Sequence, residues 1–240
     1  MYNVPMHETY HYSTSIEKIR RVVPAGNNLK ILDLGCGDGR LLADLAKQNE
    51  VYGIDQSAGA VEVARTNGVQ AIVGDIEKSL PFADASFDGV FALDILEHMV
   101  NLTGLLREIN RVLKDDGFLI IALPNHFDLR TRLDILRGMG IIKWSQRKYE
   151  KKPWDYAHIR FLTLTDVRAM LAEHGLHTEV EQYNFMSGGL LPTDLLPGFI
   201  RAWLVVTWPN LWSGKFVMRV RKQKIEKVAR IIIDKTPKDF

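Results

Sequence analysis

The sequence predicts an α/β fold built around a parallel, doubly wound sheet. Short apolar runs typical of strands alternate with segments of helical period, and this alternation indicates βαβ units. A glycine-rich turn directly after the first apolar run marks a strand-to-helix junction of such a sheet. The chain has 240 residues, of which 46% are apolar and 25% charged. This length and composition fit one large domain and exclude disordered and collagen-like proteins.

The first half of the chain has the most regular pattern. Apolar residues recur at a helical period over residues 15–23, so a first helix is expected there, ending at Pro24. Buried strands are expected at residues 30–34, 51–54, 71–73, 87–93 and 118–123. Helices are expected between them at residues 40–48, 58–66 and 102–113.

The second half is less regular. Residues 124–162 are rich in Arg, Lys, Trp and Tyr and are typical of an insertion, with a helix expected over residues 129–136. A further helix is expected over residues 165–174, with Thr163 or Thr165 as its N-cap. Two more strands are expected at residues 177–185 and 215–221, separated by an apolar connection at residues 188–214 that contains Trp203, Trp208 and Trp212.

Composition excludes several classes of protein. The single cysteine, Cys36, excludes an internal disulfide framework and suits a reducing compartment. The first residues lack the apolar core of a secretory signal, and no stretch offers the about 18 uncharged apolar residues of a spanning helix. The seven histidines form no H-E-x-x-H motif and no His/Cys cluster, so no metal site is expected. We therefore expect a cytoplasmic globular protein.

Charge is distributed unevenly along the chain. Residues 125–160 hold nine Lys/Arg against four Asp/Glu, and residues 215–240 hold nine against three. These segments are either solvated helix faces or surfaces that attract an anionic substrate, an acidic partner or a membrane. A nucleic-acid partner is disfavoured, because the basic residues form no continuous stripe with a known binding motif.

The most informative unit is the turn at residues 35–39, whose odd-numbered positions are all glycine. Glycine lets the backbone turn tightly and lets a ligand approach the main chain. Asp55 ends the next expected strand, where an acid can accept hydrogen bonds from both hydroxyls of a ribose. A dinucleotide fingerprint would need a third glycine at Arg40, and no phosphate-binding loop motif is present. We therefore expect a ribose-bearing ligand other than NAD or ATP.

With its glycine turn and the acid at Asp55, the sequence resembles the class I S-adenosylmethionine-dependent methyltransferases, of the type 11 group. The resemblance is strong over residues 29–124 and looser over 158–185. It implies a Rossmann-like sheet of seven strands with the last strand antiparallel, and lid insertions at the carboxyl edge. The matching segments are ILDLGCGDG (31–39), VYGIDQS (51–57), VGDIE (73–77), LPFADASFDGV (80–90), LEHM (96–99) and LREINRVLKDDGFLII (106–121).

The resemblance also implies a domain layout and a set of cofactor residues. Residues 1–240 would form a single methyltransferase domain, with its core at 29–124 and 158–221, an insertion at 125–157 and the apolar connection at 188–214. The cofactor is expected to be S-adenosyl-L-methionine. Its binding residues would be Asp33, Gly35, Cys36 and Gly37 for the methionine part, Asp55 with Gln56 beside it for the ribose, Asp75 for the adenine amino group, Ile76 for the adenine face, and Leu93 for the methionine end.

His98 is the candidate catalytic residue. In the family its segment borders the methyl-transfer cleft, and a histidine there could accept a proton from a hydroxyl. The alternative is that His98 only shapes the pocket or caps a helix. Asp94 is a second candidate, for which a role as a structural acceptor at the end of the fourth strand is the favoured alternative.

Candidate substrate residues lie in two segments. His158, with Trp154 and Tyr156 as walls, belongs to a segment that resembles the approach to the sixth strand in methyltransferases of small molecules and lipid-linked substrates. A turn that ties the insertion to the sheet would explain the same residues. Tyr12 is expected in a lid over the cofactor, or in a cluster that docks the first helix.

The subgroup stays open between two resemblances. The segment LPNHF (123–127) and the HIR segment (158–160) are similar to MetW-like proteins, linked to methionine biosynthesis, whereas LEH (96–98) is more similar to quinone-, lipid- or glycan-acting methyltransferases. The expected function is methyl transfer from S-adenosylmethionine to a small organic, lipid- or glycan-type acceptor. A non-catalytic cofactor-binding partner module is the alternative. The three tryptophans leave open a peripheral contact with the inner membrane surface, and the sequence does not define an oligomeric state.

Overall fold

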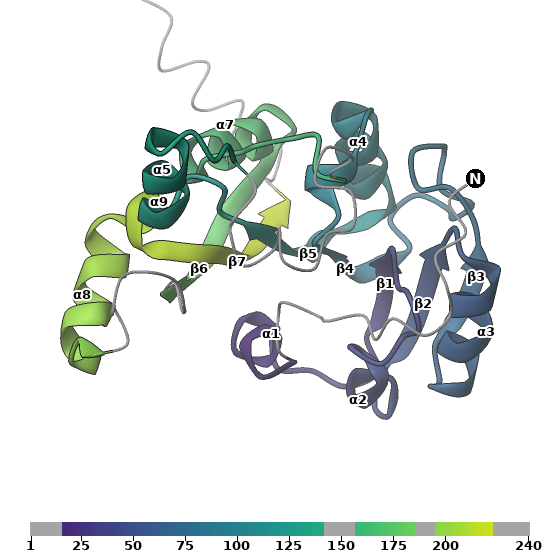
Figure 1. Cartoon of the computed structure of the whole chain (residues 1–240). Helices are drawn as coiled ribbons and strands as arrows, with labels where there is room; N and C mark the ends of the chain where they lie inside the picture. The colour runs from purple at the N-terminus through teal and green to yellow at the C-terminus, as the bar shows by residue number, and fades with distance from the viewer. Residues whose placement is uncertain (1–15, 142–156, 186–194, 223–240) are drawn as a thin grey trace, which may run out of the picture.

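The computed structural model describes residues 16–141, 157–185 and 195–222 and has an α/β architecture (Figure 1). One seven-stranded sheet has the order β3-β2-β1-β4-β5-β7-β6. Its strands are β1 (Lys30–Leu34), β2 (Glu50–Asp55), β3 (Gln70–Val73), β4 (Phe87–Leu93), β5 (Leu113–Pro124), β6 (Leu176–Phe185) and β7 (Ser213–Lys222).

Eight α-helices and one 3-10 turn are described around the sheet. The helices that follow β1 and β2 have four and nine residues, and the longest, α4, has 11 residues and comes after β4. They are α1 (Ile16–Val22), α2 (Ala43–Ala46), α3 (Ala58–Thr66), the 3-10 turn η1 (Leu96–His98), α4 (Leu102–Val112), α5 (Leu129–Leu136), α7 (Leu164–Glu173), α8 (Gly198–Thr207) and α9 (Pro209–Trp212).

The strand order confirms the predicted topology. β1 is parallel to β2 and β4, β2 to β3, and β4 to β5, whereas β7 runs antiparallel to both β5 and β6. The chain fills one side of β1 with β2 and β3 and then returns to place β4 on the other side. Ligands of open α/β sheets bind beyond the carboxyl ends of the strands at such a reversal. The ends of β1 and β4 therefore mark the expected site.

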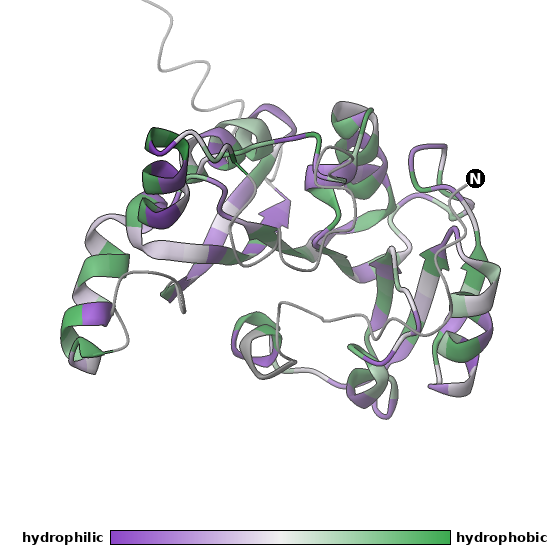
Figure 2. Cartoon of the chain, viewed as in Figure 1, coloured by the Kyte–Doolittle hydropathy of each residue, from purple (hydrophilic) through white to green (hydrophobic). Residues whose placement is uncertain are grey.

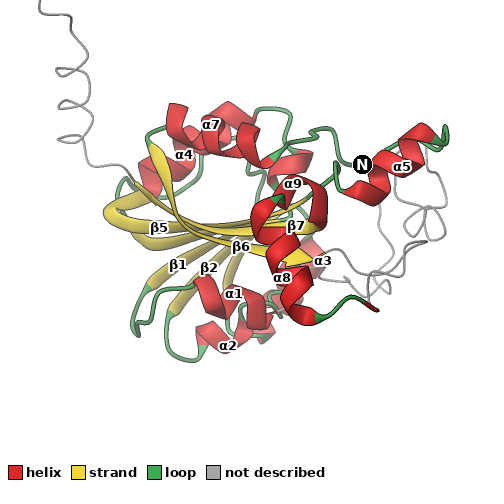
Figure 3. Cartoon of the chain, turned by 90° about the vertical axis from the view of Figure 1, so that its left-hand side faces the viewer, coloured by secondary structure: helices red, strands yellow, loops and turns green. Residues whose placement is uncertain are grey.

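The sheet is buried on both faces. Ile31 of β1 joins the apolar cluster that includes residues of α1 and α3, and Leu32 joins the opposite cluster with residues of α4 and α7. Figure 3 shows α4 and α7 on one side of the sheet and α1 and α2 on the other. This alternation between neighbouring residues is the period of two that a strand imposes, and it holds the strand ends in fixed positions.

Two expected elements differ from the structure. The helix expected at 40–48 is reduced to α2, because turns occupy the preceding residues: the Gly39 N–H donates to the Cys36 carbonyl and the Leu42 N–H to the Gly39 carbonyl. Gly39, directly before the expected helix, has φ +72° and belongs to these turns, and α2 begins only at Ala43. The apolar connection at 188–214, for which no helix or strand was specified, contains α8 and α9, and its last two residues already belong to β7. Thr163, not Thr165, caps α7, with its hydroxyl accepting from the Asp166 N–H.

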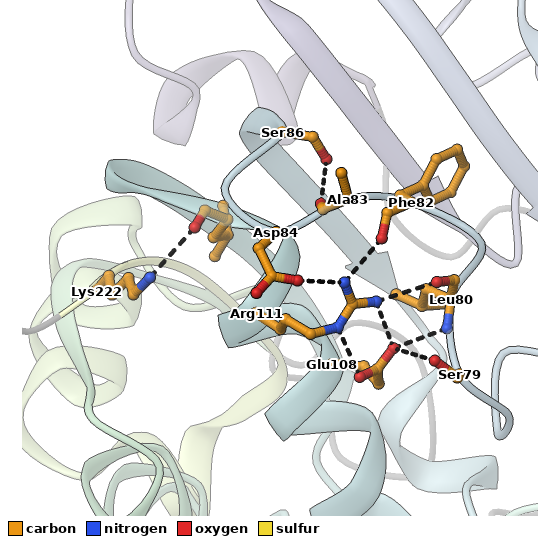
Figure 4. Close-up of polar contacts among 10 residues, drawn as sticks. Ser79, Leu80, Phe82, Ala83, Asp84, Ser86, Glu108, Arg111 and Lys222 are labelled. Atoms are coloured by element: carbon orange, nitrogen blue, oxygen red, sulfur yellow. Dashed lines mark hydrogen bonds and ion pairs between the residues drawn. The ribbon is translucent and has the colours of Figure 1, made fainter.

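An ion-pair cluster ties the segment between β3 and β4 to α4 (Figure 4). Arg111 donates to the backbone carbonyls of Leu80 and Phe82 and to the carboxylates of Asp84 and Glu108. Glu108 also accepts the Leu80 N–H at 2.8 Å. These donors, Arg111 first, lower the pKa of Glu108 to about 2. The cluster fixes the loop that leads from the end of β3 into β4.

Candidate functional site

The glycine turn after β1 is fastened to the next strand. The N–H groups of Gly35 and Cys36 both donate to the Ile54 carbonyl, at 2.8 and 3.1 Å. Gly35 has φ +69°, and a Cβ atom built on it would lie 2.2 Å from Cδ1 of Ile95. A side chain is therefore excluded both by backbone conformation and by the residue that follows β4. The turn and the end of β4 are in direct contact.

Asp55, at the end of β2, is held in a single orientation by the main chain. Its Oδ2 accepts the Gly37 N–H at 2.8 Å, and its Oδ1 accepts the Ser57 N–H at 2.9 Å. Each carboxylate oxygen has a second lone pair that these bonds do not use. The carboxylate is thus oriented with acceptor capacity remaining on both oxygens, which is what two neighbouring hydroxyls require.

Asp33, near the end of β1, and Cys36, within the turn, are both buried. Asp33 is 4% exposed, and burial, with the charge of Asp55 as the second cause, raises its pKa to about 8. Cys36 is buried, and a Cβ atom on Gly53 would lie 2.6 Å from its Sγ. Burial raises the pKa of the Cys36 thiol to about 12, followed by the effect of the nearby acids. A neutral, enclosed thiol is a packing group rather than a nucleophile.

The residues expected around the adenine lie at the ends of β2 and β3. Asp75 Oδ1 accepts the Glu77 N–H at 3.0 Å, and Gln56 Nε2 donates to the same oxygen at 3.4 Å. Gln56 therefore links the ends of the two strands. Ile76 is only 6% exposed and packs in the core, so little of its side chain is available to a ligand.

The end of β4 carries a charged pair. Leu93 is half-buried, and Asp94 has φ +56°, an uncommon value for a residue other than glycine. The Asp94 carboxylate accepts from Nζ of Lys215 on β7, and this lysine is 8% exposed. The pair joins β4 to β7 across β5, in agreement with a structural role for Asp94.

Three histidines from distant parts of the sequence meet just beyond β4. The ring centroids of His98 and His158 are 4.7 Å apart, with the rings edge to face, and His158 Nδ1 is 2.7 Å from Nε2 of His126. His98 Nδ1 donates to the Ala157 carbonyl at 3.0 Å. The backbone carbonyl of Glu97 accepts the N–H groups of Ile159 and Arg160, which fixes the second segment against η1.

The structure thus brings together the two histidines that were singled out from the sequence, His98 and His158. It adds His126 and Glu97, which were missed. Their signal was present: Glu97 precedes His98, and His126 follows β5, the strand next to β4. Trp154, Tyr156 and Tyr12 lie outside the described residues.

Comparison with known proteins identifies the family of the chain. A family model described as a methyltransferase domain matches residues 32–121. Demethylmenaquinone methyltransferase of Thermotoga maritima is 30% identical over 187 residues, covering 71% of this chain and 80% of that protein. Ubiquinone biosynthesis O-methyltransferase of Azorhizobium caulinodans is 29% identical over 154 residues, covering 61% and 58%. The chain spans from 37% to 58% of the length of the first curated relatives that it matches.

Solved structures agree on the fold. An S-adenosylmethionine-dependent methyltransferase of Thermotoga maritima has a TM-score of 0.62 at 21% identity, covering 88% of this chain and 89% of that one. The [4+2]-cyclase SpnF has a TM-score of 0.57 at 18% identity, with coverage of 87% and 80%. The sheet order and its reversal beside β1 define a doubly wound α/β protein. The similarity to demethylmenaquinone methyltransferase of Thermotoga maritima shows that the chain belongs to the S-adenosylmethionine-dependent methyltransferases, whose cofactor is S-adenosyl-L-methionine.

Proposed function

We propose that this protein binds S-adenosyl-L-methionine at the carboxyl ends of β1, β2 and β3 and transfers its methyl group to an organic acceptor. The observation that carries the proposal is the Asp55 carboxylate, held by the N–H groups of Gly37 and Ser57 with acceptor capacity left on both oxygens. The proposed cofactor residues are Asp33, Gly35, Cys36, Gly37, Asp55, Gln56, Asp75, Ile76 and Leu93.

The cofactor supplies an activated methyl group on a sulfonium, and the chain contributes mainly positioning. The glycine turn presents its backbone at the end of β1, and Asp55 orients the ribose. Ile95, whose Cδ1 lies over Gly35, forms the contact between the turn and η1. His98, at the end of η1, is the residue proposed to receive a proton from a hydroxyl acceptor, because its Nδ1 is occupied by Ala157 and its Nε2 is the remaining nitrogen.

The acceptor is proposed to be apolar, of the lipid- or glycan-linked kind. Support comes from α8, which projects at one end of the molecule and carries mostly apolar residues (Figures 1 and 2). Phe199, Trp203 and Val206 recur along one face of α8 and are 76%, 58% and 68% exposed. Exposed aromatic residues of this kind suit a membrane interface. No helix in the described parts of the chain is long and apolar enough to cross a bilayer.

We also propose that the chain forms a single domain, since β6 and β7 complete the same sheet that β1 to β5 begin. The second candidate function is a cofactor-binding module without methyl transfer. It is favoured by similarity to the bifunctional methionine biosynthesis protein MetXA/MetW of Rhodopirellula baltica, 32% identical over 168 residues, 65% of this chain and 26% of that protein.

Calorimetric titration with S-adenosylmethionine, S-adenosylhomocysteine and NAD tests the proposal. Binding of both sulfur nucleosides, with none of NAD, is the expected result. Formation of S-adenosylhomocysteine is then measured with prenylated quinol, phenol and sugar acceptors. Binding without turnover on any acceptor class would favour the module, and absence of sulfur-nucleoside binding would refute both candidates.

A further inference from the structure

Glu97 is a buried carboxylate without a hydrogen-bond partner. Its side chain is 1% exposed, and neither carboxylate oxygen has a donor among the residues that the structure describes. Burying an unpaired carboxylate carries a large desolvation penalty. Burial, followed by the charge of Asp94, raises the pKa of Glu97 to about 8. The proposed cofactor site and the proton acceptor His98 give this group no role.

Two imidazoles face the same space as this carboxylate. One ligand atom from each of Glu97, His98 and His158 can be chosen so that all three lie within 4.8 Å of one another. Ligand atoms that lie about 2.0–2.2 Å from a tetrahedral Zn²⁺ are about 3.4 Å from one another, so the distances between these three atoms would have to shorten by up to about 1.4 Å. A small inward adjustment of the side chains would complete the geometry.

Hydrogen bonds to the other ring nitrogens match those of metal-bound histidines. His98 Nδ1 donates to the Ala157 carbonyl at 3.0 Å, which leaves Nε2 as the ligand atom. His158 Nδ1 is 2.7 Å from His126 Nε2, so the His158 ring is also held through one of its nitrogens. Metal-bound histidines usually have their second nitrogen held by a carbonyl, a carboxylate or another such partner, which fixes tautomer and ring orientation. His126 is 3% exposed and is a positioning residue in this arrangement.

The charges around the cluster are consistent with a cation. Asp94, which faces Glu97 from the end of β4, adds a second carboxylate, whose partner is Lys215 of β7. Arg160 is turned away, because its guanidinium donates to the Met99 and Val100 carbonyls. A bound cation would lie beside the carboxylates of both Glu97 and Asp94.

We propose that Glu97, His98 and His158 form a binding site for one divalent transition-metal ion, with Zn²⁺ as the ion for the test. Two imidazoles and one carboxylate suit Zn²⁺ and its first-row neighbours, whereas Mg²⁺ and Ca²⁺ prefer all-oxygen sites. Three protein ligands leave at least one position open, as in catalytic zinc sites. That position would hold an oxygen of the acceptor, a role that rests on the proposed function. With the ion bound, His98 Nε2 would be a ligand and no longer the proton acceptor, and the ion would instead lower the pKa of the acceptor hydroxyl.

The sequence did not predict the site because its ligands come from separate elements. His98 and Glu97 lie in η1 after β4, and His158 lies in the segment that leads to α7. No short motif with metal-ligand spacing links them. The expectation of no metal site followed from that missing motif.

The test uses the full-length, tag-free protein after treatment with a chelator and removal of the chelator. Titration with ZnCl₂ is followed by calorimetry, and thermal unfolding is recorded with and without Zn²⁺. We expect one bound equivalent and a higher unfolding temperature with the ion, since the ion binds only the folded site. In E97Q, H98A and H158A the dissociation constant should rise at least tenfold, and in H126A about 10–100-fold. H177A, a change at an exposed histidine on β6 outside the cluster, is the matched control.

The outcomes separate this proposal from the proposed function. Equal Zn²⁺ binding by wild type, E97Q and H158A would overturn the site, and so would tight Mg²⁺ binding without Zn²⁺ binding. E97Q keeps the shape of the side chain, and its circular dichroism spectrum checks that it folds. S-adenosylmethionine titration runs in parallel: loss of cofactor binding with retained Zn²⁺ binding would refute only the proposed function.

Discussion

Replacement of Asp55 by Asn is the most direct test of the cofactor assignment. The carboxylate accepts one backbone N–H on each oxygen, from Gly37 at 2.8 Å and from Ser57 at 2.9 Å. An asparagine has only one oxygen, so in either orientation its NH₂ group faces one of these two N–H donors. The change therefore removes the negative charge, removes one acceptor for a ribose hydroxyl and leaves one backbone donor without its carboxylate acceptor.

The magnitude follows from these losses. A hydrogen bond to a charged group contributes about 1.5–3 kcal/mol. Because each 1.4 kcal/mol is a factor of ten, the dissociation constant of S-adenosylmethionine should rise about 10- to 150-fold. The asparagine of D55N can keep the Gly37 bond and turn its NH₂ group towards the exposed Ser57 N–H, which water can then satisfy. The free energy of unfolding without cofactor should therefore fall by less than about 1 kcal/mol.

The assay is calorimetric titration of D55N and wild type with S-adenosylmethionine, with denaturant unfolding of both without ligand. The matched control is E62Q, which makes the same charge change on the exposed face of the next helix, α3, where Glu62 pairs with Arg65. E62Q should bind the cofactor like wild type. Wild-type affinity in D55N, with the fold intact, would refute the ribose assignment and the reasoning from the two N–H groups.

The remaining predictions concern the turn, the ion-pair cluster and α8. G35A should unfold at a lower temperature because of its φ of +69° and the approach of Ile95 Cδ1; adding I95A should restore part of the loss, and a wild-type melting curve for G35A would contradict the packing argument. Glu108 has a pKa lowered to about 2, so the stability that it contributes is present above pH 4.5 and is lost as the pH falls towards 2. The free energy of unfolding of E108Q at pH 7 should therefore be about 1–2 kcal/mol lower than that of wild type, a figure reduced for the partial exposure of Glu108. It should fall less than that of wild type in acid, and parallel curves of stability against pH for the two proteins would contradict this prediction. W203Q should reduce the fraction of protein that co-sediments with anionic lipid vesicles, whereas V63Q, a change on α3, should not. An equal reduction in both variants would argue against a membrane contact through α8.

Local patterns predicted the first half of the fold well. The strand that becomes β1 and the turn after it are specified by neighbouring residues, as are the helix α3 and the acid at Asp55. Each of these depends on apolar period and on glycine positions within a few residues. The length predicted for the α2 helix was wrong, because hydrogen-bonded turns occupy the residues from Cys36 to Leu42. That effect depends on backbone angles rather than on apolar spacing.

Contacts between distant segments could not be predicted in the same way. His126 and His158 are 2.7 Å apart only because β5 and the segment before α7 end at the same edge of the sheet. Glu97 is buried without a hydrogen-bond donor among the described residues, and the residue pattern of the sequence does not reveal burial of this kind. The antiparallel position of β7 was inferred from family resemblance, and its cause is the long return from β6 through α8 and α9.

The strand order has a consequence for how the chain folds during synthesis. β5 and β6 do not pair with each other; each pairs with β7, which follows both in the chain. Until residues 213–222 leave the ribosome, two strands present open edges with unpaired N–H and C=O groups, which are templates for aggregation. Non-local pairing of this kind is slow to form. A chain that stops before Ser213 should therefore be retained by chaperones and recovered largely insoluble, even though its complete cofactor turn has already been made.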